Sequence, residues 1–448
     1  MTDVSRARLR RAWWEHVDEL VRCTSELVRR DTTNPPGNES LVTDYVAREL
    51  AACSIDDVTV LAAEPGRANL VARLPGDGTG RPLMLLGHAD VVAADGEGWP
   101  HPPFSGHVDE TRVWGRGTLD MKGHIAAYLL ILRLLTQYRV TLRRDVVLVV
   151  TADEESGSRL GARWLADHHP EAVAAEFAFN EGGGQRFATP GGPLYTVQVA
   201  EKGSARLRVT ARGTGGHASI PRPGNPVFRL AEALTRLSAF APPSIVSPAA
   251  EEMLRILADH HTGPAREELL GFAAAPSWHR ALALPIDPVL REFVVTALHN
   301  TAVPTLLSGG RRFNAVPDRV EAVLDGRVLP GQHPHDWCEQ VREALGPGVE
   351  VELVHGRAAP APVHAPAVLE ALRETVESME PGAGVLPYIN SAATDARALP
   401  DVAVHGFFPS RSDADIMRLA HGIGEHARID DLAFGGACLL DAVLRLAT

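Results

Sequence analysis

The chain has 448 residues, 45% of them hydrophobic and 22% charged, which is an ordinary composition for a globular protein of about two domains. A formal net charge of -12 argues against nucleic acid and against an anionic membrane surface as binding partners. The sequence contains neither an apolar run near the ~20 residues that span a bilayer nor a secretory signal, so we expect a cytoplasmic location.

The first part of the chain alternates between predicted helices and strands. Apolar residues at helical spacing predict helices over 4–30, 38–54 and 121–138. Short apolar runs predict strands over 57–62, 68–74, 82–87, 145–150 and 176–179. Polar residues follow several of these strands directly, as in GHAD, TADEE and FNEGG. This pattern predicts the α/β class, with a sheet whose functional site lies beyond the strand ends.

The character of the sequence changes near residue 204 and changes back near residue 358. The stretches SARLRVTARG and FNAVPDRVEAVLDGRV predict strands with their own periodicity. Residues 245–300 are predicted to be mostly helical and contain no motif. We therefore expect two domains, in which residues 1–203 and 359–448 form a discontinuous α/β domain and residues 204–358 form an inserted α+β domain.

The motif GHADVV at residues 87–92 begins where one predicted strand ends. His88 and Asp90 are two positions apart, so on an extended segment their side chains point to the same side. A histidine beside a carboxylate is the usual arrangement of a metal ligand and the group that orients its ring. Taken alone, however, a histidine near a strand end is more often structural, and the other polar residues must decide.

Six polar residues end strands or begin loops of the predicted α/β domain: His88, Asp120, Glu154, Glu155, Glu181 and His421. Two imidazoles and several carboxylates, with no CxxC pair among the scattered cysteines, suit zinc, or else cobalt or manganese. If Asp120 bridges, each of two ions can have one histidine, one glutamate of its own, the shared aspartate and a bridging water. We therefore expect two divalent metal ions, with Zn2+ as the first choice and Co2+ or Mn2+ as alternatives.

Glu154 directly precedes Glu155. Adjacent residues on an extended segment face opposite sides, so Glu155 can bind metal while Glu154 faces across the cleft. A carboxylate that is within reach of metal-activated water, and is not itself a ligand, is placed to act as a general base. The alternative is a solvated acid in an acidic loop. The catalytic interpretation is favoured because this loop follows a buried strand.

Taken together, the motifs resemble the di-zinc aminoacylase/carboxypeptidase metallopeptidase family, which includes acetylornithine deacetylase, succinyl-diaminopimelate desuccinylase, aminoacylase and glutamate carboxypeptidase. The matching stretches keep the family's order: GHADVV, WPHPPFSG, WGRGTLDMKG, DEESGS, NEGG, EKG, GTGGHAS, FNAVPD, RVLPG, TDAR and AHGIGE. Ala93 replaces a proline that many relatives have after DVV, and this change removes no ligand. The resemblance implies a catalytic di-metal domain with an inserted lid and dimerisation domain.

The resemblance also implies a role for each candidate residue of the α/β domain. One ion is held by the equivalents of His88, Asp120 and Glu181, and the other by those of Asp120, Glu155 and His421. The match to Glu154 is the general base, and the match to Asp90 orients the His88 ring. A cis peptide bond after Asp120 is expected on the same basis.

Further candidates come from the lid and from TDAR. His217 matches a histidine that reaches the partner subunit's site and stabilises the oxyanion, although the sequence alone favours a turn residue. Asn314 and Arg327 match lid residues that contact the substrate, the asparagine near the oxyanion and the arginine on a carboxylate, whereas most lone arginines on a strand face solvent. Thr394 and Arg397 are further candidates for substrate contacts.

These features predict a metal-dependent hydrolase that cleaves an amide bond of an N-acyl amino acid or small peptide next to a free carboxylate. Glu154 would act as the general base, and a homodimer through the lid domain is expected. The first alternative is dipeptidase or carboxypeptidase specificity. Two others are a single-metal amidase acting on a carbamoyl or related group, and a non-catalytic protein that binds an amino-acid derivative on the same scaffold.

Overall fold

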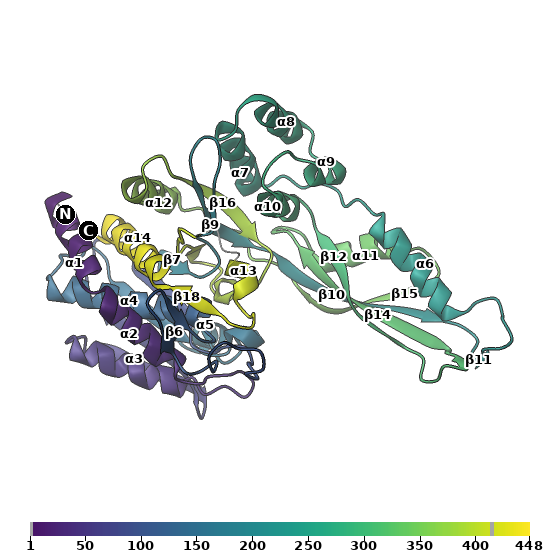
Figure 1. Ribbon diagram of the computed structural model, residues 1–448, viewed down its shortest axis with the longest axis horizontal. Coiled ribbons are helices and arrows are strands. Elements are labelled where there is room, and N and C mark those ends of the chain that lie inside the picture. Colours follow the sequence, from purple (N-terminus) through teal and green to yellow (C-terminus); the bar gives the residue numbers. More distant parts are fainter. Residues whose placement is uncertain (1–2, 413–415) are drawn as a thin grey trace. The chain divides into compact units, whose positions relative to one another are not determined.

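The computed structural model describes residues 3–412 and 416–448 (Figure 1). The chain divides into two compact units. The first unit contains Met1–Val199, Val363–Pro387 and Thr394–Thr448, and the second contains Ala200–Pro362 and Tyr388–Ala393. The inserted segment expected at 204–358 falls within the second unit, which also takes in the short segment Tyr388–Ala393.

The first unit is a mixed α/β structure. Its helices are α1 (Asp3–Glu15), α2 (Val17–Val28), α3 (Ser40–Ala52), α4 (Gly123–Gln137), α5 (Ala162–His168), α12 (Pro366–Met379), α13 (Ile416–Leu419) and α14 (Ile429–Ala447). Its longer strands are β1 (Val58–Glu64), β2 (Arg67–Leu74), β3 (Leu83–His88), β6 (Val146–Thr151), β7 (Phe177–Asn180) and β17 (Ala403–Gly406). The strands β9 (Leu194–Glu201) and β16 (Gly384–Asn390) begin in this unit and run into the second. Short strands are β4 (His107–Val108), β5 (Arg112–Trp114), β8 (Arg186–Phe187) and β18 (His426–Arg428).

One nine-stranded sheet organises this unit, in the order β1-β2-β6-β3-β7-β17-β9-β16 with β8 beside β9. The central strands β6, β3, β7 and β17 are parallel to one another. The strands β1 and β2 pair antiparallel at one side. Because parallel strands end at the same edge of a sheet, the residues that follow β3, β6 and β7 are brought together there.

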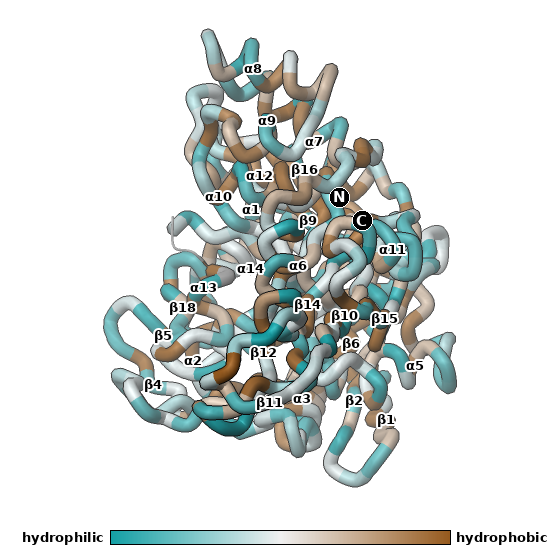
Figure 2. The backbone as a smooth tube through the Cα atoms, turned by 90° about the vertical axis from the view of Figure 1, so that its right-hand side faces the viewer, coloured by the Kyte–Doolittle hydropathy of each residue, from teal (hydrophilic) through white to brown (hydrophobic). Residues whose placement is uncertain are grey.

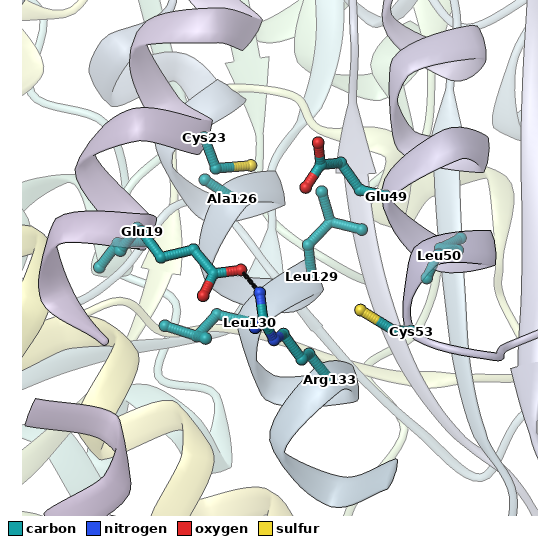
Figure 3. A pocket seen from close by; sticks show the side chains of 10 residues that line it. Glu19, Cys23, Glu49, Leu50, Cys53, Ala126, Leu129, Leu130 and Arg133 are labelled. Carbon is teal, nitrogen blue, oxygen red and sulfur yellow. Dashed lines mark hydrogen bonds and ion pairs between the residues drawn. The ribbon is translucent and has the colours of Figure 1, made fainter. Parts of the chain in front are cut away.

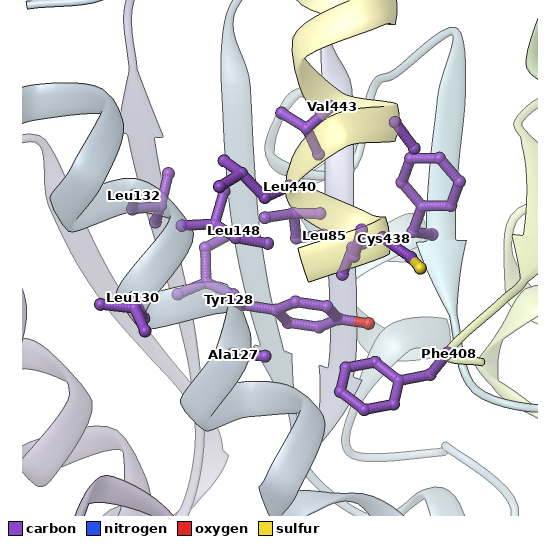
Figure 4. Packing of buried hydrophobic residues seen from close by; sticks show 14 of the residues in the cluster. Leu85, Ala127, Tyr128, Leu130, Leu132, Leu148, Phe408, Cys438, Leu440 and Val443 are labelled. Carbon is purple, nitrogen blue, oxygen red and sulfur yellow. The ribbon is translucent and has the colours of Figure 1, made fainter. Parts of the chain in front are cut away.

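The central strands are buried on both faces, which explains why they are continuous apolar runs. Leu85 and Leu148 face a layer of helices that includes α4 and α14, where they pack near Tyr128 and Leu440 (Figure 4). Met84 and the other alternate residues face the opposite side, where they pack with residues around α5. Figure 2 shows how hydrophobic residues, drawn in brown, alternate with hydrophilic ones along the chain.

The second unit contains an antiparallel sheet in the order β12-β14-β10-β15. The strands of this sheet are β10 (Gly203–Arg212), β12 (Thr301–Gly309), β14 (Arg319–Val328) and β15 (Glu350–Arg357). The short strands β11 (Gly216–His217) and β13 (Ala315–Val316) form a separate pair in the same unit. Its helices are α6 (Pro226–Ser238), α7 (Pro248–Asp259), α8 (Gly263–Ala274), α9 (Trp278–Leu282), α10 (Pro288–Leu298) and α11 (Pro334–Leu345). Buried residues of α6 and α11 cover one face of the sheet, and β14 alternates between more and less buried residues as a one-sided strand does.

Two local features refine the prediction. The helix expected over 4–30 is broken, because His16 leaves helical geometry (φ −114°, ψ 18°) while its Nδ1 donates to the carbonyl of Ala12 at 2.7 Å. The peptide bond between Asp120 and Met121 is cis, so that prediction is confirmed. None of the helices that the structure describes is both long and apolar enough to cross a bilayer.

The cysteines are all free thiols, and Cys23, Cys338 and Cys438 are buried. Cys23 and Cys53 line one cavity of about 20 Å³ between α2, α3 and α4 (Figure 3). An ion pair between Glu19 and Arg133 lies in the same cavity, drawn as a dashed line. Cys23 and Cys53 are therefore packing residues of the helical layer. Burial raises the pKa of Cys23 to about 12.

Candidate metal centre

The parallel strands bring four of the predicted site residues to one edge of the sheet. His88 is the last residue of β3, and Glu154 and Glu155 lie in a short 3₁₀ turn (Glu154–Ser156) soon after β6. Glu181 follows β7 directly. The three strands are neighbours in the sheet, so their carboxyl ends place an imidazole and three carboxylates in one region.

Asp120 lies between two imidazoles. Its Oδ1 is 2.8 Å from Nε2 of His88, and its Oδ2 is 3.0 Å from Nε2 of His421. Asp120 reaches this position from the tight turn Thr118–Lys122, which precedes α4. His421 reaches it from the loop before β18 and has a left-handed backbone (φ 63°). A carboxylate that offers one oxygen to each of two histidines has the geometry of a bridging ligand.

The two remaining candidate ligands lie beside these histidines. Oε1 of Glu155 is 3.2 Å from Nε2 of His421, and Oε2 of Glu181 is 3.7 Å from Nε2 of His88. Donor atoms of His88, Asp120 and Glu155 lie within 4.8 Å of one another, and so do those of His88, Glu154 and Glu181. The second group includes Glu154, for which the sequence predicts the role of a base.

His88 is fixed for metal binding by its other ring nitrogen. Nδ1 donates to the backbone carbonyl of Asp90 at 3.0 Å, and the carboxylate of Asp90 is 3.5 Å away. In the neutral imidazole this leaves the lone pair on Nε2, as a metal ligand requires. The ring is 1% exposed, so its orientation is also held by packing.

The buried carboxylate of Asp90 accepts hydrogen bonds from the turn that contains the two glutamates. It accepts the backbone N–H groups of Glu154 and Glu155, both at 3.1 Å, and the side-chain amide of Asn34 at 2.8 Å. Asp90 therefore connects the end of β3 to the 3₁₀ turn after β6. The carboxylate has no exposed surface, so these hydrogen bonds replace its hydration.

The charges of the cluster favour bound cations. Burial and the charge of Asp120 raise the pKa of Glu181 to about 8, and burial and the charge of Glu181 raise the pKa of Glu154 well above its usual range. Hydrogen bonds with Asp120 and Glu155 raise the pKa of His421 to about 10. Positive charge among these carboxylates would stabilise their ionised forms. With imidazole nitrogens and carboxylate oxygens as donors, the residues present fit divalent ions.

Several buried residues that support the site had no role assigned from the sequence. Asp153 has a left-handed backbone (φ 65°), and its carboxylate accepts the backbone N–H groups of Arg159 and Leu160 at 2.9 and 3.2 Å. Arg67 contacts this carboxylate at 3.2 Å and forms a two-bond ion pair with Glu39. The only signal in the sequence is that Asp153 begins the DEE motif.

Thr394 and Asp395 of the TDAR motif are buried near the same sheet edge. Oγ of Thr394 accepts the backbone N–H of Ala396 and the side-chain amide of Asn180, both at 3.1 Å. Asp395 accepts hydrogen bonds from Thr151 and Ser158, both at 2.5 Å. Thr394 therefore caps the short helix Asp395–Ala398, which also carries Arg397.

The candidates of the inserted segment lie in the second unit. His217 is the last residue of β11 and Asn314 precedes β13; the two strands pair, and the backbone carbonyl of Asn314 accepts the N–H of Ala218 at 3.0 Å. Both residues are exposed. Arg327 is near the other end of the unit's sheet, on β14, where its Nε and Nη2 contact Asp325 and its Nη1 donates to the carbonyl of Ser391 at 3.1 Å.

The fold and the site define a two-unit α/β protein with a carboxylate- and histidine-rich candidate metal centre at the carboxyl edge of its sheet. Residues 84–445 match the model of peptidase family M20/M25/M40, and the chain belongs to this family. It is therefore a hydrolase of the metallopeptidase class, with a metal-binding group among its described residues.

Two relatives with curated names are similar over most of their length. The probable carboxypeptidase S-like 2 of Dictyostelium discoideum is 28% identical over 368 residues, which are 78% of this chain and 68% of that protein. The N-fatty-acyl-amino acid synthase/hydrolase PM20D1 of Homo sapiens is 28% identical over 363 residues, 77% of this chain and 70% of that protein. The fold is similar to that of the M20 family metallo-carboxypeptidase Sso-CP2 from Sulfolobus solfataricus, with a TM-score of 0.69, 18% identity and coverage of 96% and 99% of the two chains.

Proposed function

We propose that this protein hydrolyses an amide bond of an N-acyl amino acid or small peptide next to a free carboxylate. The observation that carries the proposal is the position of Asp120, whose two carboxylate oxygens each approach a different imidazole. That arrangement supports two divalent ions, with zinc as the first choice. His88, Asp120 and Glu181 would hold one ion, and Asp120, Glu155 and His421 would hold the other.

Divalent ions at such a centre polarise a bound carbonyl and lower the pKa of water. The chain's own contribution to proton transfer is Glu154. Its carboxylate would accept the proton of the attacking water and deliver it to the leaving nitrogen. The hydrogen bond from its backbone N–H to Asp90 supports this role, because it fixes the start of the side chain without engaging the carboxylate.

We further propose that His217 and Asn314 act at the site of a partner subunit. Within the second unit, the paired strands β11 and β13 lie beyond the Arg319 end of β14, whereas Arg327 lies near its other end. Arg319 and Arg327 are eight positions apart on this strand, which corresponds to about 27 Å. His217 and Arg327 of one chain are thus too far apart to contact one small substrate, and the histidine is available to a second chain.

The edge strand β12 supports a homodimer through this unit. It is an outer strand of its sheet, and its apolar residues Leu306 and Leu307 are 64% and 69% exposed. An unpaired, apolar strand edge is a template for pairing with another strand. A second copy of β12 running antiparallel would satisfy the backbone groups of both edges and cover these leucines.

Arg327 is proposed to hold the free carboxylate of the substrate. A guanidinium has five N–H donors, and the contacts with Asp325 and Ser391 use three of them. No contact with another described residue uses the two remaining donors, which are therefore available to a substrate carboxylate. The pair with Asp325 also fixes the plane of the guanidinium, which a bidentate contact requires.

A substrate panel with metal removal tests the proposal. Protein stripped by a chelator should be inactive, and adding Zn2+, Co2+ or Mn2+ should restore hydrolysis of N-acetyl, N-succinyl, long-chain N-acyl or N-aminoacyl amino acids. The matched controls are the same compounds with the carboxylate converted to an amide, which should be poor substrates. Equal turnover of the blocked compounds would reject the role of the free carboxylate. A metal-loaded protein that hydrolyses none of the panel would reject the proposed substrate class.

Dipeptidase or carboxypeptidase specificity is the second candidate, and the name of the Dictyostelium relative favours it. Preferential cleavage of N-aminoacyl over N-acetyl and N-succinyl substrates would select it. Activity that saturates at one equivalent of metal would instead favour the single-metal amidase. Stoichiometric binding of an amino-acid derivative without turnover would favour a binding protein.

A further inference from the structure

A buried ion pair joins two motifs that are 309 positions apart in the sequence. Nη1 of Arg116, in WGRG, contacts Oε2 of Glu425, in AHGIGE, at 2.5 Å. The two residues are 3% and 0% exposed. They lie beside the paired short strands β5 and β18, which bring the motifs together. Neither residue is a candidate ligand or base, so the proposed mechanism leaves this pair without a role.

Glu425 holds the backbone that leads to Asp120. Its carboxylate accepts the N–H groups of Gly117 at 3.1 Å and of Leu119 at 2.9 Å, and that of Asp120 lies at 3.4 Å. One buried carboxylate thus faces three backbone N–H groups at the start of the turn that carries Asp120. The position of the Asp120 side chain follows from the position of this turn.

Arg116 holds the loop that contains His421. Its Nη2 donates to the carbonyls of His421 and Gly422, at 3.0 and 3.3 Å. The imidazole of His421 is about half exposed, with 51% of its side-chain surface accessible, so packing alone does not fix it. The guanidinium therefore connects the His421 backbone to Glu425 and, through Glu425, to the Asp120 turn.

The WPHPPF loop packs against the same assembly. The guanidinium of Arg116 lies over the ring of Trp99, with Cζ 5.3 Å from the ring centroid. Pro100 lies beside Gly424, where an added Cβ would be 3.4 Å from the proline Cδ. This contact gives a structural reason for a motif that supplies neither a candidate ligand nor a base.

We propose that Arg116 and Glu425, with Trp99 behind them, are positioning residues that set the distance between His421 and Asp120. The inference rests on the proposed function in taking these two residues as ligands of one ion. Arg116 contacts the His421 loop directly and reaches the Asp120 turn only through Glu425. Its replacement should therefore weaken mainly the ion held by Asp120, Glu155 and His421, and affect the ion held by His88, Asp120 and Glu181 much less.

The test is a titration of metal-free protein with Zn2+, followed by calorimetry, and with Co2+, followed by visible absorption. Wild-type protein should bind two equivalents. Arg116→Lys keeps a charge opposite Glu425, but a single ammonium cannot also reach the two carbonyls. One equivalent should bind about 10- to 100-fold more weakly, the usual cost of losing a group that orients a metal ligand. The other equivalent should change by less than about threefold.

Arg10→Lys is the matched control, because it makes the same substitution in another ion pair of the same unit. Arg10 contacts the fully buried Asp441 at 2.7 Å. This variant should bind both equivalents as the wild type does. A second comparison uses His421→Ala, which should lose one equivalent. Adding Arg116→Lys to that variant should leave the remaining equivalent unchanged, since both changes affect the same ion.

The outcomes separate this inference from the proposed function. Wild-type protein that binds no ion overturns the proposed metal centre. Two tight equivalents in both the wild type and Arg116→Lys overturn only the positioning role. The same holds if adding Arg116→Lys to His421→Ala weakens the one equivalent that this variant still binds. If Arg116→Lys does not fold, Trp99→Leu decides: it should weaken the same equivalent about threefold or more, and unchanged binding rejects the role.

Discussion

The carboxylate of Asp90 accepts the backbone N–H of Glu154 at 3.1 Å, so the end of β3 directly holds the turn that carries the proposed base. Asp90 has no exposed surface, and it also accepts the N–H of Glu155. One carboxylate thus sets the spacing between His88 and both glutamates. The position of the Glu154 backbone does not depend on the Glu154 side chain, which allows a clean substitution there.

Replacing Glu154 by glutamine should remove the base and leave the metal centre intact. We expect kcat to fall by at least ~100-fold, the usual scale for a lost general base, with metal content per chain unchanged. Steady-state kinetics and elemental analysis of the same sample measure both quantities. Near-wild-type activity would reject Glu154 as the base, and a loss of metal would make it a ligand.

Mixing inactive subunits tests whether His217 acts across a dimer. In a heterodimer of Glu154→Ala and His217→Ala chains, one of the two sites would contain both residues. With random exchange, half of the dimers are mixed, so activity should recover to about one quarter of the wild-type value. Glu154→Ala mixed with Glu181→Ala is the matched control and should stay inactive, because both residues belong to one site. Absence of recovery, after exchange has been verified, would contradict the proposal.

Charge introduced on the β12 edge should weaken the proposed dimer. Leu306→Glu would bring like charges close to each other across a two-fold axis, and we expect dimer affinity to fall about 10-fold or more. Light scattering over a concentration series measures it. Leu270→Glu, in α8 of the same unit and 48% exposed in the wild type, is the control that should leave association unchanged. Equal association of both variants with the wild type would exclude this edge.

Lys202 should titrate near neutral pH. Burial, with a smaller effect from the charge of Arg327, lowers its pKa from 10.5 to about 7. Its Nζ donates to the carbonyl of His299 at 2.5 Å. The chain contains two lysines, Lys122 and Lys202, so ¹³C-lysine labelling gives two side-chain signals, and Lys202→Met removes one. A Lys202 signal that titrates above pH 10 would contradict the prediction.

The sign of the effect of Lys202 on stability follows from this shift. Between pH 7 and pH 10.5 the unfolded chain binds a proton at this residue that the folded chain does not, so its contribution to folding improves as pH rises. The burial cost is full below pH 7, on the order of a few kcal/mol. The free energy of unfolding, measured with denaturant, should therefore be higher for Lys202→Met than for the wild type. This difference should be largest near pH 7 and should shrink toward pH 10.

The sequence predicts residues that follow apolar strands better than it predicts their supports. Three of the candidate ligands are recognisable because each comes soon after a short apolar run: His88, Glu155 and Glu181. The strands before them pair in parallel, and this pairing brings the three residues to the same edge of the sheet. The pair of Arg116 and Glu425 depends on a contact across 309 positions, which has no local periodicity. The break at His16 is not predictable for a different reason. The apolar positions keep their helical spacing through both helices, so periodicity does not mark the break.

The second unit is not a single continuous piece of chain, because Tyr388–Ala393 belongs to it. The ring of Tyr388 packs edge-on against Phe293 at 4.8 Å, and the carbonyl of Ser391 accepts a hydrogen bond from Arg327. A chimaera that exchanged residues 200–362 with a homologue would thus graft a foreign fragment against a native hexapeptide. Recombination within this family should preserve folding more often when residues 200–362 and 388–393 are inherited from the same parent.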